Sequence, residues 1–173
     1  RDDQGYKNRN SFLEIINDVS KFTFMPITVG GKIKSLNDIE KRLKLGADKV
    51  SINTMAFKDK NFISNAAKEF GSQCIVVSID VKKNNEQKYE VFINCGTQGT
   101  STLAIDYAKK AEEQGAGEIL INFIDNDGAG KGYDIEYLNT FTRNINCPVI
   151  SAGGVGEWAH FKEALDHTRV DAV

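Results

Sequence analysis

Two acidic side chains lie at or shortly after the ends of apolar runs. At such a place a carboxylate is exposed at the end of a strand. Asp80 ends the run at residues 75–80, and Asp127 belongs to an Asp-Asn-Asp-Gly segment at 125–128 after a second run. A carboxylate in such a place can act as a general acid or base. The alternatives are a strand-end aspartate that accepts backbone N–H bonds and a plain turn. A calcium loop is excluded, because residues 130–133 do not continue the ligand pattern of an EF-hand.

Two glycine pairs, at residues 30–31 and 153–154, each follow a short apolar strand pattern. Glycine lets backbone N–H groups approach a phosphate, although a single pair is more often only a turn. The two pairs are 123 residues apart, and Asp171 follows Asp48 by the same interval. A (β/α)₈ barrel uses about 250 residues for eight units, so this interval is close to four units. The sequence therefore predicts a half-barrel repeat and a substrate with two phosphates.

Strand and helix patterns alternate along the chain, which predicts an α/β fold of parallel βα units in a single domain over residues 1–173. Residues 82–101 interrupt the alternation as a long excursion with an extra strand at 89–94. We expect a (β/α)₈ TIM-barrel fragment that lacks the first two strands and is cut in the last. The expected core strands are 25–29, 49–53, 74–81, 118–124, 149–152 and a last one entered near residue 170; the expected helices are 12–19, 35–45, 61–70, 103–114, 135–144 and 158–165.

The composition of the chain limits the kinds of protein that it can be. With 173 residues and 40% hydrophobic content the chain can bury a sizeable core, and its net charge of −2 gives no support for nucleic-acid or membrane-surface binding. No apolar run approaches the roughly 20 residues of a membrane span. Three widely spaced cysteines favour reduced thiols and a cytoplasmic location. His160 and His167 lack the spacing of a metal site or triad, so we expect surface histidines, no metal and no cofactor.

Other polar residues have two interpretations each. Asn53 and Thr54 follow a strand, where they can donate to a phosphate held by Gly31 or cap the following helix. Lys49 and Glu118 begin their strands, on the face opposite the strand ends. Charges on that face of a barrel usually serve stability.

Taken together, these motifs resemble the cyclase subunit of imidazole glycerol phosphate synthase, almost from end to end and in order. The resemblance implies a two-fold repeated (β/α)₈ barrel and a lyase of histidine biosynthesis that forms a heterodimer with a glutaminase subunit. Such a cyclase uses ammonia to convert a bis-phosphorylated ribulosyl carboxamide ribonucleotide to imidazole glycerol phosphate and aminoimidazole carboxamide ribotide. The matching segments are 28–31, 46–54, 70–73, 78–80, 115–120, 124–128 and 153–154.

The resemblance also assigns roles to individual residues. Asp80 matches one of two catalytic aspartates of the family, and Asp48 matches a residue that faces the glutaminase. Lys49 and Glu118 match charged residues around the mouth through which ammonia enters, which reverses the stability interpretation. Asn53 and Thr54 match donors to one phosphate; Asp127, Gly128, Gly154 and Val155 match the region around the other, to which the glycine pairs add Gly31 and Gly153.

Several positions depart from the family pattern. Lys32 replaces a third glycine, Cys95 replaces a serine, and Asn122-Phe123 replaces a Thr-Ser pair. The second catalytic aspartate belongs to a first strand outside this sequence. These departures are similar to a branch found with surface-polysaccharide genes, so the alternative is an ammonia-channelling subunit that serves a sugar amidotransferase. The sister isomerase of histidine synthesis ranks lower, because it leaves Lys49 and Glu118 unexplained.

Overall fold

The structure, a computed structural model, describes residues 9–173 of the chain. The strands are β1 (Thr28–Gly30), β2 (Lys49–Ile52), β3 (Ile75–Lys83), β4 (Tyr89–Ile93), β5 (Gln98–Leu103), β6 (Glu118–Phe123) and β7 (Val149–Ala152). The helices are α1 (Arg9–Ser20), α2 (Leu36–Lys44), α3 (Thr54–Lys58), α4 (Phe62–Phe70), α5 (Ala104–Glu113), α6 (Ile135–Thr142) and α7 (Trp158–His167), with a 3₁₀ turn at Ser72–Cys74. Strands and helices alternate in this part of the chain except for the successive helices α3 and α4 and the successive strands β3, β4 and β5.

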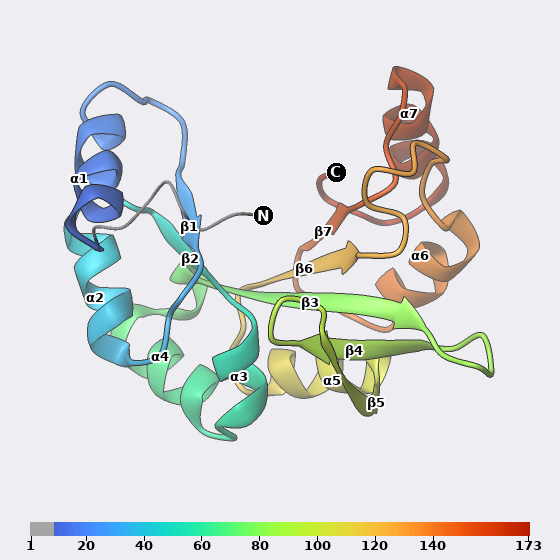
Figure 1. Cartoon of the computed structure of the whole chain (residues 1–173), viewed down its shortest axis with the longest axis horizontal. Coiled ribbons are helices and arrows are strands. Elements are labelled where there is room, and N and C mark those ends of the chain that lie inside the picture. The colour runs from blue at the N-terminus through green and yellow to red at the C-terminus, as the bar shows by residue number, and fades with distance from the viewer. Residues whose placement is uncertain (1–8) are drawn as a thin grey trace.

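Five parallel strands form the main part of the sheet. They lie side by side in the order β1, β2, β3, β6 and β7. In Figure 1 they make an open arc with β1 and β7 at its two edges. A βα chain whose strands pair in parallel is the pattern of a (β/α)₈ barrel, and the α/β prediction is confirmed.

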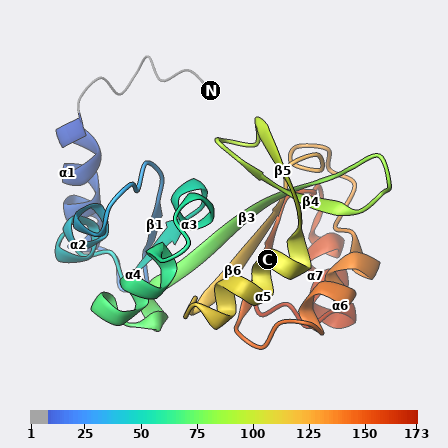
Figure 2. The same cartoon turned by 90° about the horizontal axis from the view of Figure 1, so that it is seen from below.

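The two faces of the arc differ in character because successive side chains of a strand point to opposite faces. Ile79 of β3 and Ile121 of β6 are fully buried in the hydrophobic core on the helix side. In Figure 2, α5 lies beside β3 and β6 and α4 lies near the start of β3, which agrees with the contacts of α5 to both strands and of α4 to β3. Burying a side chain of this size contributes about 1.5–3 kcal/mol. Asp80 and Asn122 alternate with these residues and therefore point to the concave face.

The excursion at residues 82–101 is an antiparallel hairpin. The strand expected at 89–94 is confirmed as β4, which pairs with the end of β3. The structure adds β5, which pairs with β4 and delays the start of α5 to Ala104. Residues 98–103 contain no apolar alternation and are mostly exposed, so only the backbone ladder identifies them as a strand.

The structure corrects two of the expected strands and adds one helix that was not expected. The strand predicted at 25–29 begins only at Thr28, because Phe24 and Met25 are exposed. The last expected strand is present only as a bridge between Ile150 and Ala172. The short helix α3 precedes the helix that was expected from residue 61. None of the helices within residues 9–173 is long and apolar enough to cross a membrane.

Matching hydrogen bonds occur at the amino-terminal ends of β1 and β7. The Asp48 carboxylate accepts from the N–H of Ile27 at 2.7 Å, and the Asp171 carboxylate accepts from the N–H of Val149 at 2.8 Å. In each case the aspartate N–H donates back to the carbonyl of the same residue. Two aspartates with one role at equivalent strands support the half-barrel repeat.

A second matching pair lies at the starts of α2 and α7. The N–H of Lys34 donates to Asp38 at 3.0 Å, and the N–H of Gly156 donates to Nδ1 of His160 at 3.1 Å. These positions are 122 residues apart, one fewer than the interval between the glycine pairs.

The His160 side chain is only 15% exposed, so the expectation of a surface histidine is wrong.

Candidate functional site

Asp80 lies at the carboxyl end of the arc with an amide partner on the next strand. The parallel register places Asp80 beside Asn122, and the Asn122 amide donates to Oδ1 of Asp80 at 3.0 Å. Within the described residues, Oδ2 of Asp80 makes no hydrogen bond or ion pair. The amide fixes one carboxylate oxygen and leaves the other for proton transfer. Sequence reasoning noted Asn122 only as a departure, because the contact follows from strand register.

The loop after β6 carries the second predicted carboxylate. The carbonyl of Phe123 accepts from the N–H groups of Asn126 and Asp127 at 2.9 and 3.0 Å, which folds a tight turn. The Asp127 side chain is exposed and makes no hydrogen bond or ion pair within residues 9–173. The structure therefore places Asp127 beyond the next strand end but does not bring it into contact with Asp80. The following Gly128 has φ +77°, with open space where a Cβ would point.

The two glycine turns share a left-handed backbone. Gly31 and Lys32 have φ values of +93° and +54°, and Gly153 and Gly154 have values of +92° and +116°. The matching conformations are thus Gly31 with Gly153 and Lys32 with Gly154, at the 122-residue interval. This corrects the 123-residue alignment of the glycine pairs by one position. Lys32 occupies a conformation that costs an L-residue about 1–2 kcal/mol.

Asn53 and Thr54 connect β2 to the hairpin tip. The Thr54 hydroxyl donates to Asn53 Oδ1 at 3.3 Å and accepts from the N–H of Asn94 at 3.0 Å. Asn53 stands at the N-cap position of α3, but its side chain makes no cap hydrogen bond. The helix-cap interpretation is therefore wrong at the level of the side chain. The Thr54 hydroxyl holds the β4–β5 hairpin over the end of β2.

The second turn is closely packed against the loop after β6. The carbonyl of Gly154 accepts from the N–H of Gly132 at 2.7 Å. A Cβ on Gly154 would lie 2.3 Å from the Gly132 carbonyl oxygen, and one on Gly153 would lie 2.6 Å from that of Phe123. Val155 is half-buried and packs against the core. This turn requires glycine for its φ angles and also for close backbone contact.

An ion pair lies at the amino-terminal ends of the strands, at the other end of the arc from Asp80. Lys49 Nζ pairs with Glu118 Oε1, from the first residues of β2 and β6, across the intervening β3. Their side chains are 30% and 17% exposed. The exposed Asp48 beside them holds the backbone of Ile27. The two charges predicted at separate strand starts thus form one contact.

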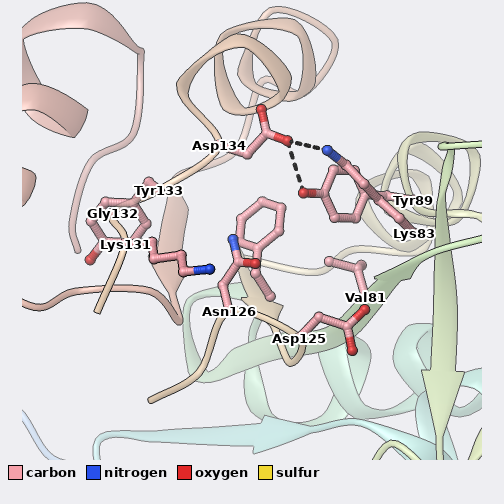
Figure 3. Close-up of a pocket in the computed structure, with 10 residues that line it drawn as sticks. Val81, Lys83, Tyr89, Asp125, Asn126, Lys131, Gly132, Tyr133 and Asp134 are labelled. Carbon is pink, nitrogen blue, oxygen red and sulfur yellow. Dashed lines mark hydrogen bonds and ion pairs between the residues drawn. The ribbon is translucent and has the colours of Figure 1, made fainter. Parts of the chain in front are cut away.

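A cavity of about 290 Å³ lies between the β4 strand and the loop after β6 (Figure 3). Its walls include Val81, Phe123 and Lys83, which belong to the helix side of the sheet, so it lies on the face opposite Asp80. In one wall, Asp134 accepts from Lys83 and from the Tyr89 hydroxyl, both at 2.9 Å. This carboxylate links the hairpin to the start of α6.

Asp134 is also the N-cap of α6, because it accepts from the N–H of Tyr137 at 3.1 Å. Burial acts to raise the pKa of Asp134, but hydrogen bonds from Lys83, Tyr137 and Tyr89 outweigh it and lower the pKa below its usual value. Burial and the bond to Asp134 raise the pKa of Tyr89. The charged form of Asp134 is therefore the one that the fold favours.

Asp134→Asn is expected to lower the free energy of unfolding by about 2 kcal/mol at pH 7, the range of a hydrogen bond to a charged group. Because the folded pKa is the lower one, the carboxylate contributes fully above its unfolded pKa of about 4 and loses its contribution as the pH falls. Urea unfolding at pH 7 and about pH 3 checks this prediction. Glu86→Gln, which breaks the exposed pair with Lys88, is the control and should change nothing measurable. A deficit in Asp134→Asn that is the same at both pH values would contradict it.

An arc of parallel βα units, with polar groups and left-handed turns at the strand ends, defines a protein of the (β/α)₈-barrel class. The family model for histidine biosynthesis proteins matches residues 3–173, and the chain belongs to this family.

Individual relatives carry a more specific name. Over 167 residues the chain is 44% identical to imidazole glycerol phosphate synthase subunit HisF of Hydrogenobaculum sp. (strain Y04AAS1). Over 168 residues it is 42% identical to the HisF subunits of Clostridium botulinum strains 657 / Type Ba4 and Kyoto / Type A2. Each match covers 96% of this chain and 66% of the relative, so the chain spans slightly less than two thirds of the length of these relatives.

Proposed function

We propose that the full-length protein is the cyclase subunit of imidazole glycerol phosphate synthase. In this reaction ammonia attacks the ribulosyl carboxamide ribonucleotide, which is split and cyclised to imidazole glycerol phosphate and aminoimidazole carboxamide ribotide. The observation that carries this proposal is the Asp80 carboxylate at the carboxyl end of the sheet. One of its oxygens accepts a hydrogen bond from the Asn122 amide. Membership of the histidine biosynthesis family and the similarity to HisF subunits support the proposal.

Asp80 is the proposed acid or base, because one carboxylate oxygen is oriented and the other can exchange a proton with substrate. Asp127 is the proposed second carboxylate of this chain, from the loop after β6. Proton transfers during ring closure need a donor and an acceptor on different sides of the reacting carbon and nitrogen atoms. Asp80 and Asp127, which follow successive strands of the parallel sheet, are the two carboxylates proposed to share these transfers.

The left-handed turns are the proposed phosphate sites, one for each end of the substrate. Backbone N–H groups of such turns act as donors to an anion. Gly31, Asn53 and Thr54 belong to the first site. The second site comprises Gly128, Gly153, Gly154 and Val155.

A glutaminase subunit is the proposed partner, in a heterodimer that delivers ammonia past the amino-terminal ends of the strands, at the other end of the arc from Asp80. Asp48 belongs to the proposed docking surface, and the Lys49–Glu118 pair is the proposed gate. This ion pair spans β3 at the amino-terminal ends of the strands and is made by side chains alone. It can open by rotation of the lysine without movement of the strands.

Lys49→Ala is expected to increase the glutamine consumed per product several-fold, because it opens the proposed gate and leaves Glu118 without its partner. Activity with free ammonium salt should persist. Glutaminase and cyclase rates of the reconstituted complex are measured together. Lys44→Ala, which removes a lysine from the exposed pair with Glu40, is the matched control. An unchanged coupling ratio in Lys49→Ala would count against the gate.

The relatives named above are HisF subunits, which favours the cyclase over the sugar-amidotransferase alternative and over the sister isomerase.

The direct test supplies purified full-length protein with the bis-phosphate substrate and an ammonium salt, without glutaminase. Formation of both products supports the proposal. Absence of both products from protein that binds the substrate would refute it. The first-strand residue of the full-length protein gives a second test, since an aspartate fits a cyclase and an apolar residue fits an ammonia channel.

A further inference from the structure

Arg42 of α2 is buried directly behind the first glycine turn, with an exposed fraction of 7%. Its Nη2 donates to the carbonyl of Gly31 at 2.9 Å, and its Nη1 donates to the carbonyl of Asp38 at 2.6 Å. Its Nε is buried and has no hydrogen-bond partner in the described part of the chain. The guanidinium is thus directed at the backbone of the turn.

Within the described residues, no carboxylate forms an ion pair with this guanidinium. The nearby Asp38 carboxylate accepts instead from the N–H of Lys34 and the hydroxyl of Ser35, both at 3.0 Å. Burial lowers the pKa of Arg42, and the charge of Asp38 opposes this shift. Arginine nevertheless stays protonated in proteins, and burying its charge without an ionic partner is unfavourable.

The fold itself does not require an arginine at this position. The equivalent residue of the second half, 122 positions later, is Ala164, which is fully buried. A small apolar side chain therefore serves the same helix–sheet packing. The charge is a property of the first turn alone, where Lys32 also replaces the glycine found at Gly154.

The contact to Gly31 determines how the turn presents its backbone. In a trans peptide the C=O and N–H groups point in opposite directions. Because Arg42 binds the Gly31 carbonyl, the N–H end of the Gly31–Lys32 peptide points away from α2. Among residues 9–173, no atom outside Gly31 and its two chain neighbours lies within 4 Å of an ideal Cβ on Gly31.

We propose that Arg42 is a positioning residue that directs the Gly31–Lys32 peptide, and a net positive charge behind it, toward a phosphate monoester at the first turn. It does not touch the substrate. This inference rests on the proposed function, which assigns one phosphate end of the substrate to this turn. In the second turn the Gly132 N–H instead holds the carbonyl of Gly154, which is the residue equivalent to Lys32.

The first test compares Arg42→Met with Lys41→Met in the full-length protein. Both changes remove one positive charge from α2, but Lys41 is exposed. Arg42→Met is expected to raise the KM for the bis-phosphate substrate by about tenfold, the loss expected for one charge-assisted hydrogen bond. Its kcat should change much less, because binding at a remote phosphate is uniform between substrate and transition state. Lys41→Met should match the wild type.

Arg42→Lys keeps the charge and should recover part of the KM loss, which a purely space-filling role would not predict. An unchanged KM in Arg42→Met, or a kcat that falls in step with the rise in KM, would overturn the proposal.

Inorganic phosphate provides a probe that needs no turnover. In amide NMR titrations of the wild type, Lys32 should respond saturably, and Arg42→Met should weaken that response about tenfold while Gly154 keeps its affinity. A Lys32 response that is equal in wild type and Arg42→Met refutes the role of Arg42 but leaves the cyclase proposal intact. A wild type without cyclase activity refutes the proposed function, and the phosphate titration then still decides the role of Arg42.

Discussion

Asp80→Asn in the full-length protein is expected to lower the rate of ammonia-dependent cyclisation by about 10²–10⁴-fold, the usual contribution of a positioned acid or base. Asparagine keeps the shape of the side chain and an oxygen that can accept from Asn122, so the fold should persist. It cannot exchange a proton near neutral pH. The KM for the substrate should stay close to the wild-type value, because the phosphate ends bind elsewhere. Steady-state rates with saturating ammonium salt measure the effect.

Asp125→Asn is the matched control, since it makes the same chemical change after the neighbouring strand. Asp125 pairs with Lys82 at 3.2 Å and does not contact Asp80, so its kcat should be close to the wild-type value. Asp127→Asn separates two roles: a shared proton transfer lowers kcat, whereas a contact near the second phosphate raises KM. Substantial turnover by Asp80→Asn would contradict the assignment of the acid or base.

Sequence periodicity predicted the βα order and the position of Asp80, because these depend on local patterns. The run at residues 74–81 is apolar except at Ser78 and Asp80, as expected for a largely buried strand, and the structure confirms residues 75–81 as part of β3. The sequence also located the turns at Gly31 and Gly153, and glycine tolerates the positive φ that both residues adopt there. Sequence patterns fail where backbone pairing alone defines an element, as in β5.

Contacts between distant residues could not be predicted from patterns. Lys49 and Glu118 are 69 positions apart and meet only because β2 and β6 flank β3. Arg42 looks like one of several basic residues on α2, yet it lies three positions after the buried Ile39 and thus on the inner face of the helix. That spacing was the available signal. Its partner, a backbone carbonyl, leaves no trace in the sequence.

The two turns therefore reach one backbone conformation by different means. A side chain of α2 holds the first turn, and direct backbone contact with the loop after β6 holds the second. This difference predicts different tolerance to the same substitution. At Gly31 an added methyl group meets open space, whereas at Gly154 it meets the Gly132 carbonyl at 2.3 Å.

Gly154→Ala is accordingly expected to lower the free energy of unfolding by roughly 2–5 kcal/mol. This figure combines about 1–2 kcal/mol for a left-handed L-residue with a further 1–3 kcal/mol for backbone displacement. Gly31→Ala, the matched control, should lose only the first contribution, about 1–2 kcal/mol. Urea unfolding of both variants measures the difference.

The same comparison separates stability from phosphate binding at the two turns. Displacement of the Gly132 carbonyl also moves the loop that carries Asp127 and Gly128, so Gly154→Ala should weaken the second phosphate site even in the folded protein. Gly31→Ala should leave that site unchanged. Equal losses of stability in both variants would mean that the backbone contact at Gly154 relaxes freely. The loop after β6 would then not be fixed by the second turn, and the proposed placement of Asp127 would lose its structural support.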